Sequence, residues 1–141
     1  MRSTNRLAKA QRYLGSSELL LRDGDVDSAV SRAYYAVLHA AKAMLMIHGH
    51  PEVEDWKTHP QVLNTCAREN RRYTWFQDVR PLTGERDLQR SLFVLHALRD
   101  DADYEVDKIT PAGAREALRF ARDFIRCVER KIHEREGQTR T

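Results

Sequence analysis

Cysteine, glycine and proline are scarce in this 141-residue sequence, and long apolar runs are absent. The two cysteines, Cys66 and Cys127, stand in unrelated contexts, which favours free thiols in a reducing cytoplasm over a disulfide framework. No cysteine or histidine pair has the spacing of metal ligands. No apolar run approaches the ~20 residues of a membrane span, and the first residues lack the apolar core of a secretory signal. The sequence therefore predicts a cytoplasmic protein with no membrane span, no metal and no cofactor.

Charged residues, by contrast, are plentiful: they make up 32% of the chain beside 41% hydrophobic residues, as in a soluble globular protein. The length suits one domain over residues 1–141, with a core over about 5–136. Net charge is +3, and arginine supplies 19 of the 24 basic residues. Arginine suits bidentate recognition of carboxylate or phosphate, although a GC-rich genome explains the bias equally well. This mild basicity permits an anionic partner such as RNA without requiring one.

The hydrophobic residues recur at three- and four-residue steps, and strand-like alternation is absent. This pattern predicts an all-α, up-and-down bundle of four long helices and one short helix. The long helices are expected over residues 5–23, 26–48, 85–102 and 111–136, and the short helix begins near residue 59 or 60. Gly24 and Asp25 separate the first two helices, and Thr110 followed by Pro111 is a strong start signal for the last. Residues 69–87 are expected to be irregular or broken helix, and residues 137–141 to fray.

The helix expected over 85–102 carries an arginine on its apolar stripe. At 100° per residue, Arg99 lies in one sector with Leu92 and Leu95. A buried charge is unfavourable unless it is paired or faces a cleft. Asp103 lies one turn further on and is placed to pair with Arg99. Two interpretations stay open: a structural ion pair at a helix end, or an arginine that binds phosphate in a groove between helices or subunits.

The helix over 26–48 places polar-capable side chains inside its apolar sequence. Arg32, Tyr35 and His39 are among them, and Tyr35 and His39 share one face. Buried tyrosine and histidine side chains normally find hydrogen-bond partners, so they fit an ordinary core. Alternatively, they line the same groove as Arg99. His59, in the segment KTHPQV, is the most interesting isolated histidine, although its simplest role is to begin a helix.

Two further arginine-rich segments favour structural roles. One is a row of arginines on the last helix, made of Arg115, Arg119, Arg122, Arg126 and Arg130. Acidic neighbours flank this row, which favours a solvated, ion-paired face over a nucleic-acid track. The other is the segment RRYTWF over residues 71–76, which mixes basic and aromatic residues as single-strand binders do. Within a short irregular segment, its aromatic residues Tyr73, Trp75 and Phe76 are expected to anchor the bundle.

Three segments together resemble a known family. They are DSAVSRAYYAVLHAAKAMLMIHG, THPQV and LRDDADY, and in this order and spacing they are similar to a HEPN domain of the small stand-alone prokaryotic type. The resemblance covers about residues 5–130. It implies a homodimeric bundle of four to five helices, often encoded beside a minimal nucleotidyltransferase as a toxin–antitoxin-like pair. Many members are metal-independent RNases in which an Arg-x(4–6)-His motif meets its copy at the dimer interface.

This sequence departs from that motif. When Arg99 takes the place of the arginine, Tyr104 stands at the histidine position, and a phenol is a poor general base because it ordinarily titrates near pH ~10. The spacing also occurs at Arg32–His39, Arg90–His96 and Arg126–His133, about as often as chance predicts. Arg90–His96 lies on the appropriate helix, but its two side chains point roughly 120° apart.

Three hypotheses follow from the sequence. In the first, the chain is a binding module, the toxin-like or accessory partner of a nucleotidyltransferase. It holds nucleotide or RNA through a groove lined by Arg99, Arg32, Tyr35, His39, His59, Asp103 and Tyr104. In the second, the chain is an active RNase centred on Arg99 or on Arg90–His96, with Arg99, His96 and Tyr104 as the candidate catalytic residues. In the third, it is a purely structural interaction protein, in which a change at Arg99 alters stability alone.

Overall fold

The computed structural model describes residues 2–140, with side chains described for residues 2–138. These residues form helices and no strands, which confirms the predicted all-α bundle. The elements are α1 (Arg2–Arg22), α2 (Val26–Ile47), the short 3-10 helix η1 (Pro51–Asp55), α3 (His59–Tyr73), α4 (Leu88–Tyr104) and α5 (Pro111–Arg140).

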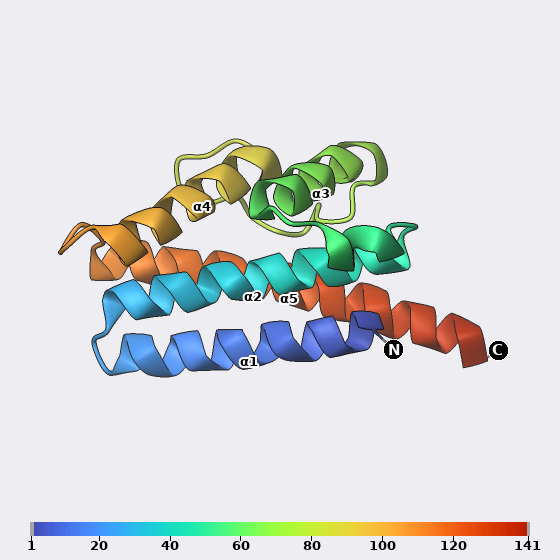
Figure 1. Cartoon of the computed structure of the whole chain (residues 1–141), viewed down its shortest axis with the longest axis horizontal. Helices are drawn as coiled ribbons and strands as arrows, with labels where there is room; N and C mark the ends of the chain where they lie inside the picture. Colours follow the sequence, from blue (N-terminus) through green and yellow to red (C-terminus); the bar gives the residue numbers. More distant parts are fainter. Residues whose placement is uncertain (1, 141) are drawn as a thin grey trace.

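The helices form two groups (Figure 1). The three longest helices, α1, α2 and α5, run side by side along the long axis of the molecule, and α3 and α4 lie on the side away from α1. Helix α2 contacts every other α-helix, so it is the centre of the bundle. This central place matches its sequence, because α2 is the most apolar helix and its many alanines allow close approach of neighbouring helices.

Helices α2 and α5 each begin at a side-chain cap that the sequence predicts. Asp25 accepts a hydrogen bond from the amide of Ser28 at 3.2 Å, and Gly24 before it takes a φ of +85°. Thr110 accepts from the amide of Gly113 at 3.0 Å. Such caps satisfy amides that have no partner within the helix. The starts of α2 and α5 are therefore confirmed.

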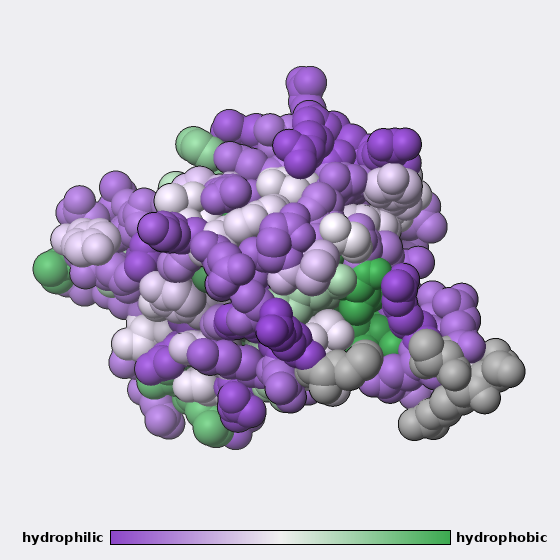
Figure 2. Space-filling model, turned by 45° about the vertical axis from the view of Figure 1, so that its right-hand side comes forward, coloured by the Kyte–Doolittle hydropathy of each residue, from purple (hydrophilic) through white to green (hydrophobic). Residues whose placement is uncertain are grey.

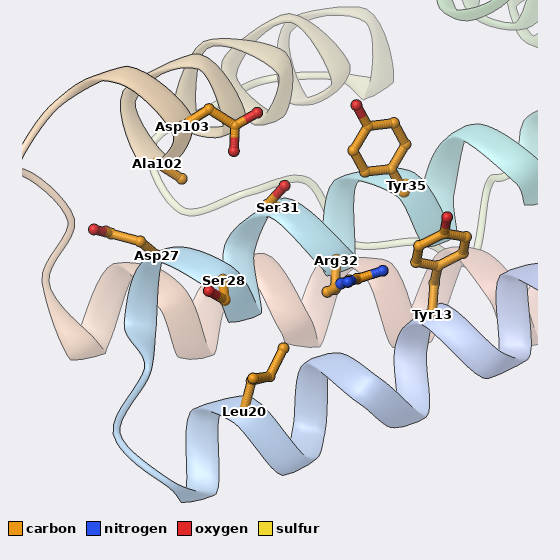
Figure 3. A pocket seen from close by; sticks show the side chains of 9 residues that line it. All are labelled: Tyr13, Leu20, Asp27, Ser28, Ser31, Arg32, Tyr35, Ala102 and Asp103. Carbon is orange, nitrogen blue, oxygen red and sulfur yellow. The ribbon is translucent and has the colours of Figure 1, made fainter.

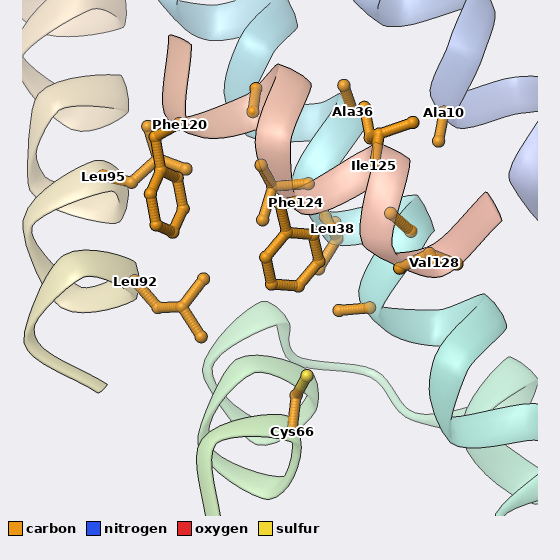
Figure 4. Close-up of a cluster of buried hydrophobic side chains, with 14 of the residues drawn as sticks. Ala10, Ala36, Leu38, Cys66, Leu92, Leu95, Phe120, Phe124, Ile125 and Val128 are labelled. Atoms are coloured by element: carbon orange, nitrogen blue, oxygen red, sulfur yellow. The ribbon is translucent and has the colours of Figure 1, made fainter. Parts of the chain in front are cut away.

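The core lies where α2 and α5 meet the inner faces of α3 and α4 (Figure 4). Phe124 of α5 stacks on Phe76, with ring centroids 4.1 Å apart. Trp75 and Phe76 are buried, as expected for anchors, but Tyr73 is 50% exposed and does not anchor the bundle. Cys66 and Cys127 are both free and buried.

Several helix bounds differ from the sequence prediction. Helix α3 continues into residues expected to be irregular or broken helix and ends at Tyr73, where Thr74 takes a left-handed φ of 50°. Helix α4 begins at Leu88 because Asp87 caps it, accepting from the amide of Arg90 at 2.8 Å. Helix α5 is described as far as Arg140, beyond the end expected near residue 136. A single Gly137 weakens a helix by only ~1 kcal/mol and does not end it. Thr141 lies outside the described residues.

The surface of the bundle is mainly polar. Hydrophilic side chains dominate the face shown in Figure 2, and apolar side chains reach it only in small separate areas. Among residues 2–140, no helix combines the length and the apolar character needed to cross a membrane.

Candidate functional site

Arg99 of α4 has three polar partners within the chain. Its Nη2 donates to the hydroxyl of Tyr35 at 2.8 Å, which joins α4 to α2. Its Nη1 donates to Asp100 at 3.1 Å, and its Nε lies 2.9 Å from a carboxylate oxygen of Asp103 without hydrogen-bond alignment. The pairing of Arg99 with Asp103 is therefore confirmed. Only 18% of the Arg99 side chain is exposed, so the guanidinium lies at the edge of the interior.

Aromatic rings also surround this guanidinium. Its central carbon lies 5.6 Å from the ring centre of Tyr34 and 5.5 Å from that of Tyr35, within the range of cation–π attraction. Burial disfavours the charged form of Arg99, but the phenol oxygen and two carboxylates beside it outweigh burial, so its pKa is raised. Arg99 is therefore a permanent cation that fixes Tyr35 and Asp103 in place.

A pocket of about 410 Å³ opens between α1, α2 and α4 (Figure 3), and its lining residues Tyr35 and Asp103 contact Arg99. It gathers three of the predicted binding residues, Arg32, Tyr35 and Asp103, from two helices. Arg32 also lies over the ring of Tyr13, 5.4 Å from its centre. The complete lining is Tyr13, Leu20, Asp27, Ser28, Ser31, Arg32, Tyr35, Ala102 and Asp103. The pocket thus combines two tyrosine rings, one arginine, two serine hydroxyls and two carboxylates.

His39 lies close to this pocket but does not line it. Its ring stacks on Tyr13 at 5.3 Å, and its Nδ1 accepts a hydrogen bond from Arg6 at 2.9 Å. Arg6 in turn binds both carboxylate oxygens of Glu54, at 2.6 and 2.9 Å. Burial, followed by the charge of Arg6, lowers the pKa of His39 to about 3. His39 is therefore neutral at physiological pH, and its ring packs against one face of Tyr13.

His59 and His96 lie around Tyr34. The ring centres of His59 and His96 are 5.8 and 5.5 Å from that of Tyr34, and His59 also meets the ring of Tyr35 edge-on. Burial, followed by the charge of Arg99, lowers the pKa of His59. His96 lies 3.5 Å from Asp100, which also pairs with Arg99. The hydroxyl of Tyr34 is buried and has no hydrogen-bond partner among the described residues.

Tyr104 stays apart from these groups. Its side chain is 77% exposed at the end of α4. The arginine and histidine of each Arg-x(4–6)-His spacing also do not contact each other. Arg90 turns towards Phe93 and Glu85 rather than His96, and Arg32 lines the pocket that His39 does not reach. Arg126 and His133 line separate hollows of the surface.

Arg119, Arg122 and Arg130 of the α5 arginine row are ion-paired, as the acidic neighbours of the row predict. Arg119 binds Glu116 and Asp123 as well as two backbone carbonyls, and it holds the pKa of Glu116 at about 2. Arg122 pairs with Glu18, and Arg130 pairs with Asp78. This face therefore fastens α5 to α1 and to the segment between α3 and α4.

Sequence reasoning did not identify Tyr13, Arg6 or Glu54. Tyr13 lies one residue beyond a run of basic residues at three- and four-residue steps in α1, and that run is the signal that could have drawn attention to it. Nothing in the sequence pairs Arg6 with Glu54, because Glu54 stands in a 3-10 helix that the pattern does not predict. Among residues 2–140, no group of three or more potential ligands is placed to hold a metal ion.

The fold places the chain among the small all-α helical bundles. Residues 4–131 match the HEPN domain, and the chain therefore belongs to the HEPN domain family. A UPF0332 protein of Pyrococcus horikoshii is 50% identical over 36 residues. That stretch covers 26% of this chain and 25% of the archaeal protein, so the chain spans only a quarter of that relative in the match. No solved structure matches the chain.

Proposed function

We propose that this HEPN protein is the toxin-like or accessory partner of a minimal nucleotidyltransferase and binds a nucleotide or RNA in the pocket beside Arg99. One observation carries the proposal: Arg32, Tyr35 and Asp103 converge on a single pocket of about 410 Å³. The family resemblance supplies the partner class, and a homodimer is part of the same proposal. A small nucleotidyltransferase encoded beside this chain would support the partnership.

The chemistry of the pocket suits the parts of a nucleotide. The rings of Tyr13 and Tyr35 line the pocket, and a base that stacks on Tyr13 would take the place of Arg32 over that ring. The carboxylates of Asp27 and Asp103 can accept hydrogen bonds from ribose hydroxyls or from base amino groups. Arg32 is the cation of the lining and suits a phosphate.

Arg99 has a positioning role in this proposal. It would have to release a carboxylate or Tyr35 before it could bind a phosphate directly, since its three nitrogens already face partners. Its contribution is to orient Tyr35 and to neutralise Asp103, which would otherwise repel an anion. Loss of Arg99 should therefore weaken binding while most of the bundle stays folded.

Calorimetric titration with ATP and with a short single-stranded oligoribonucleotide tests the proposal. Arg99→Ala and Arg32→Ala should each weaken binding at least tenfold. Arg115→Ala is the matched control, because this exposed arginine of α5 lies outside the pocket. If both variants bind like the wild type, or if the wild type binds neither ligand, the pocket assignment is wrong.

A specific arrangement favours metal-independent RNA cleavage as a second candidate function. His96 lies one helical turn before Arg99 and beside Asp100, while His59 lies near the same tyrosine pair. A neutral His59 could take a proton, and His96 could donate one. Cleavage that persists in EDTA and is lost in both His59→Ala and His96→Ala would support it. Arg90→Ala is the control, and an inert wild type at high concentration would exclude this function.

A further inference from the structure

Several basic side chains gather on one part of α1. A shallow hollow of about 310 Å³ is lined by Arg2, Asn5, Arg6, Lys9, Arg12 and Glu54. The α1 basic surface is defined here as Arg2, Arg6, Lys9 and Arg12 together with Lys42 of α2. Its lining carboxylate, Glu54, binds Arg6 through both oxygens, and it attracts Lys42 and Arg2 only at longer range.

The remaining cations of this surface lack close counter-charges. Among the described residues, no carboxylate lies within 4 Å of Arg2, Lys9, Arg12 or Lys42, whereas Arg119, Arg122 and Arg130 of α5 each have an acidic partner. Burial, followed by the charge of Arg6, lowers the pKa of Lys42. Crowded cations without partners create a positive potential that attracts anions.

The α1 basic surface also leads into the pocket beside Arg99. Arg2, Arg6, Lys9 and Tyr13 follow one another at three- and four-residue steps, so they share one face of α1. From Arg2 to Arg12 the helix rises about 15 Å, which is longer than one phosphate group requires. Tyr13 lines the pocket, and it stacks on His39, the residue that Arg6 holds. Cations and an aromatic face therefore follow one another along a single track.

We propose that the α1 basic surface binds the phosphate backbone of single-stranded RNA and guides the strand into the pocket at Tyr13. Single-strand binders combine a cationic track for the backbone with aromatic faces for the bases. A mononucleotide would fill only the pocket, whereas a strand of several nucleotides would use both parts. This inference rests on the proposed function in that it names the ligand class of the same pocket.

An anionic membrane surface fits these residues less well. A membrane-surface helix inserts an apolar face between lipids. The apolar residues of α1 near these cations, Leu7 and Ala10, are buried in the bundle. The exposed large apolar residue of α1, Leu19, lies at the opposite end of the helix.

Fluorescence anisotropy with a labelled single-stranded 12-nucleotide RNA, at several salt concentrations, tests the inference. The double variant Lys9→Ala/Arg12→Ala should bind this RNA at least tenfold more weakly. Its plot of log affinity against log salt should lose about 1.4 units of slope, since each lost phosphate contact removes roughly 0.7. The control Arg115→Ala/Arg126→Ala removes the same charge from α5 and should bind like the wild type.

Two parallel measurements separate this inference from the proposed function. ATP binding should be unchanged in Lys9→Ala/Arg12→Ala, because neither residue lines the pocket. If ATP binds the pocket but RNA affinity does not depend on Lys9 and Arg12, the inference is overturned and the proposed function stands. If RNA binding depends on them although ATP does not bind, the α1 surface stands and the nucleotide pocket fails. Binding to phosphatidylserine vesicles is measured in the same way. If it depends on Lys9 and Arg12 at least as strongly as RNA binding does, the surface belongs to membranes and the inference is overturned.

Discussion

Two adjacent tyrosines of α2 have opposite hydrogen-bonding states. The hydroxyl of Tyr35 accepts from Arg99 at 2.8 Å, whereas the hydroxyl of Tyr34 is buried and has no partner among the described residues. Burial raises the pKa of Tyr34, which keeps its phenol neutral. Because a buried polar group without a partner is unfavourable and a bond to a charged group is stabilising, the same substitution should act in opposite directions at the two positions.

Tyr35→Phe removes the acceptor of the Arg99 guanidinium. We expect the free energy of unfolding to fall by about 1–2 kcal/mol, because a hydrogen bond to a charged group is lost within a partly buried cluster. Urea denaturation measures the change. Tyr13→Phe is a suitable control, because the Tyr13 hydroxyl makes none of the hydrogen bonds of Arg99. Equal stability of Tyr35→Phe and the wild type would contradict the prediction.

Tyr34→Phe removes the hydroxyl that has no partner. We expect the free energy of unfolding to rise by about 1 kcal/mol, because the desolvation penalty of that group disappears while its ring contacts persist. The same urea titration measures it. A clear loss of stability would show that the hydroxyl has a favourable role in the folded protein.

At the scale of elements, α4 carries the candidate site and depends on the segment before it. Ser91 is fully buried, accepts a hydrogen bond from the amide of Leu82 at 3.0 Å and donates to the carbonyl of Asp87 at 2.9 Å. One hydroxyl thus fastens the loop after α3 to the first turn of α4. The orientation of His96 and Arg99 further along α4 depends on that connection.

Ser91→Ala should lower the free energy of unfolding by about 1–3 kcal/mol, because it leaves the buried amide of Leu82 without its acceptor. Thermal unfolding followed by circular dichroism measures the effect. Ser16→Ala on α1 is the control, and it should change stability by less than about 0.5 kcal/mol. A Ser91 variant as stable as this control would refute the connecting role.

The elements also show how far sequence reasoning extends. Local signals were sufficient where they were strong, as at Gly24 with Asp25 and at Thr110 with Pro111. The stripe of α4 correctly placed Arg99 near the interior and beside Asp103. The contact of Arg99 with Tyr35 could not be predicted, because it depends on how α4 packs against α2, 64 residues away. The partner of His39 was missed for the same reason, since Arg6 approaches it from α1.

At the scale of the whole molecule, three histidines of the interior share one electrostatic tendency. Burial is the first cause that lowers the pKa of His39, His48 and His59. For His39 the geometry agrees, because its Nδ1 accepts from a permanently charged Arg6 and a proton there would place two cations 2.9 Å apart. The unfolded chain binds protons at these sites below pH ~6.5, while the folded chain resists them.

The folded protein should therefore lose stability as pH falls below about 6.5, before the carboxylates reach their usual range. His39 has a folded pKa of about 3, so it alone should remove about 2 kcal/mol between pH 7 and pH 5. Urea denaturation at both pH values checks this. His39→Asn keeps an acceptor for Arg6 but cannot titrate, so its stability should fall by about 2 kcal/mol less than that of the wild type. His133→Asn changes an exposed histidine of α5 and should retain the full wild-type dependence. If the His39 and His133 variants respond alike to acid, the Arg6–His39 contact does not govern the acid sensitivity of this bundle.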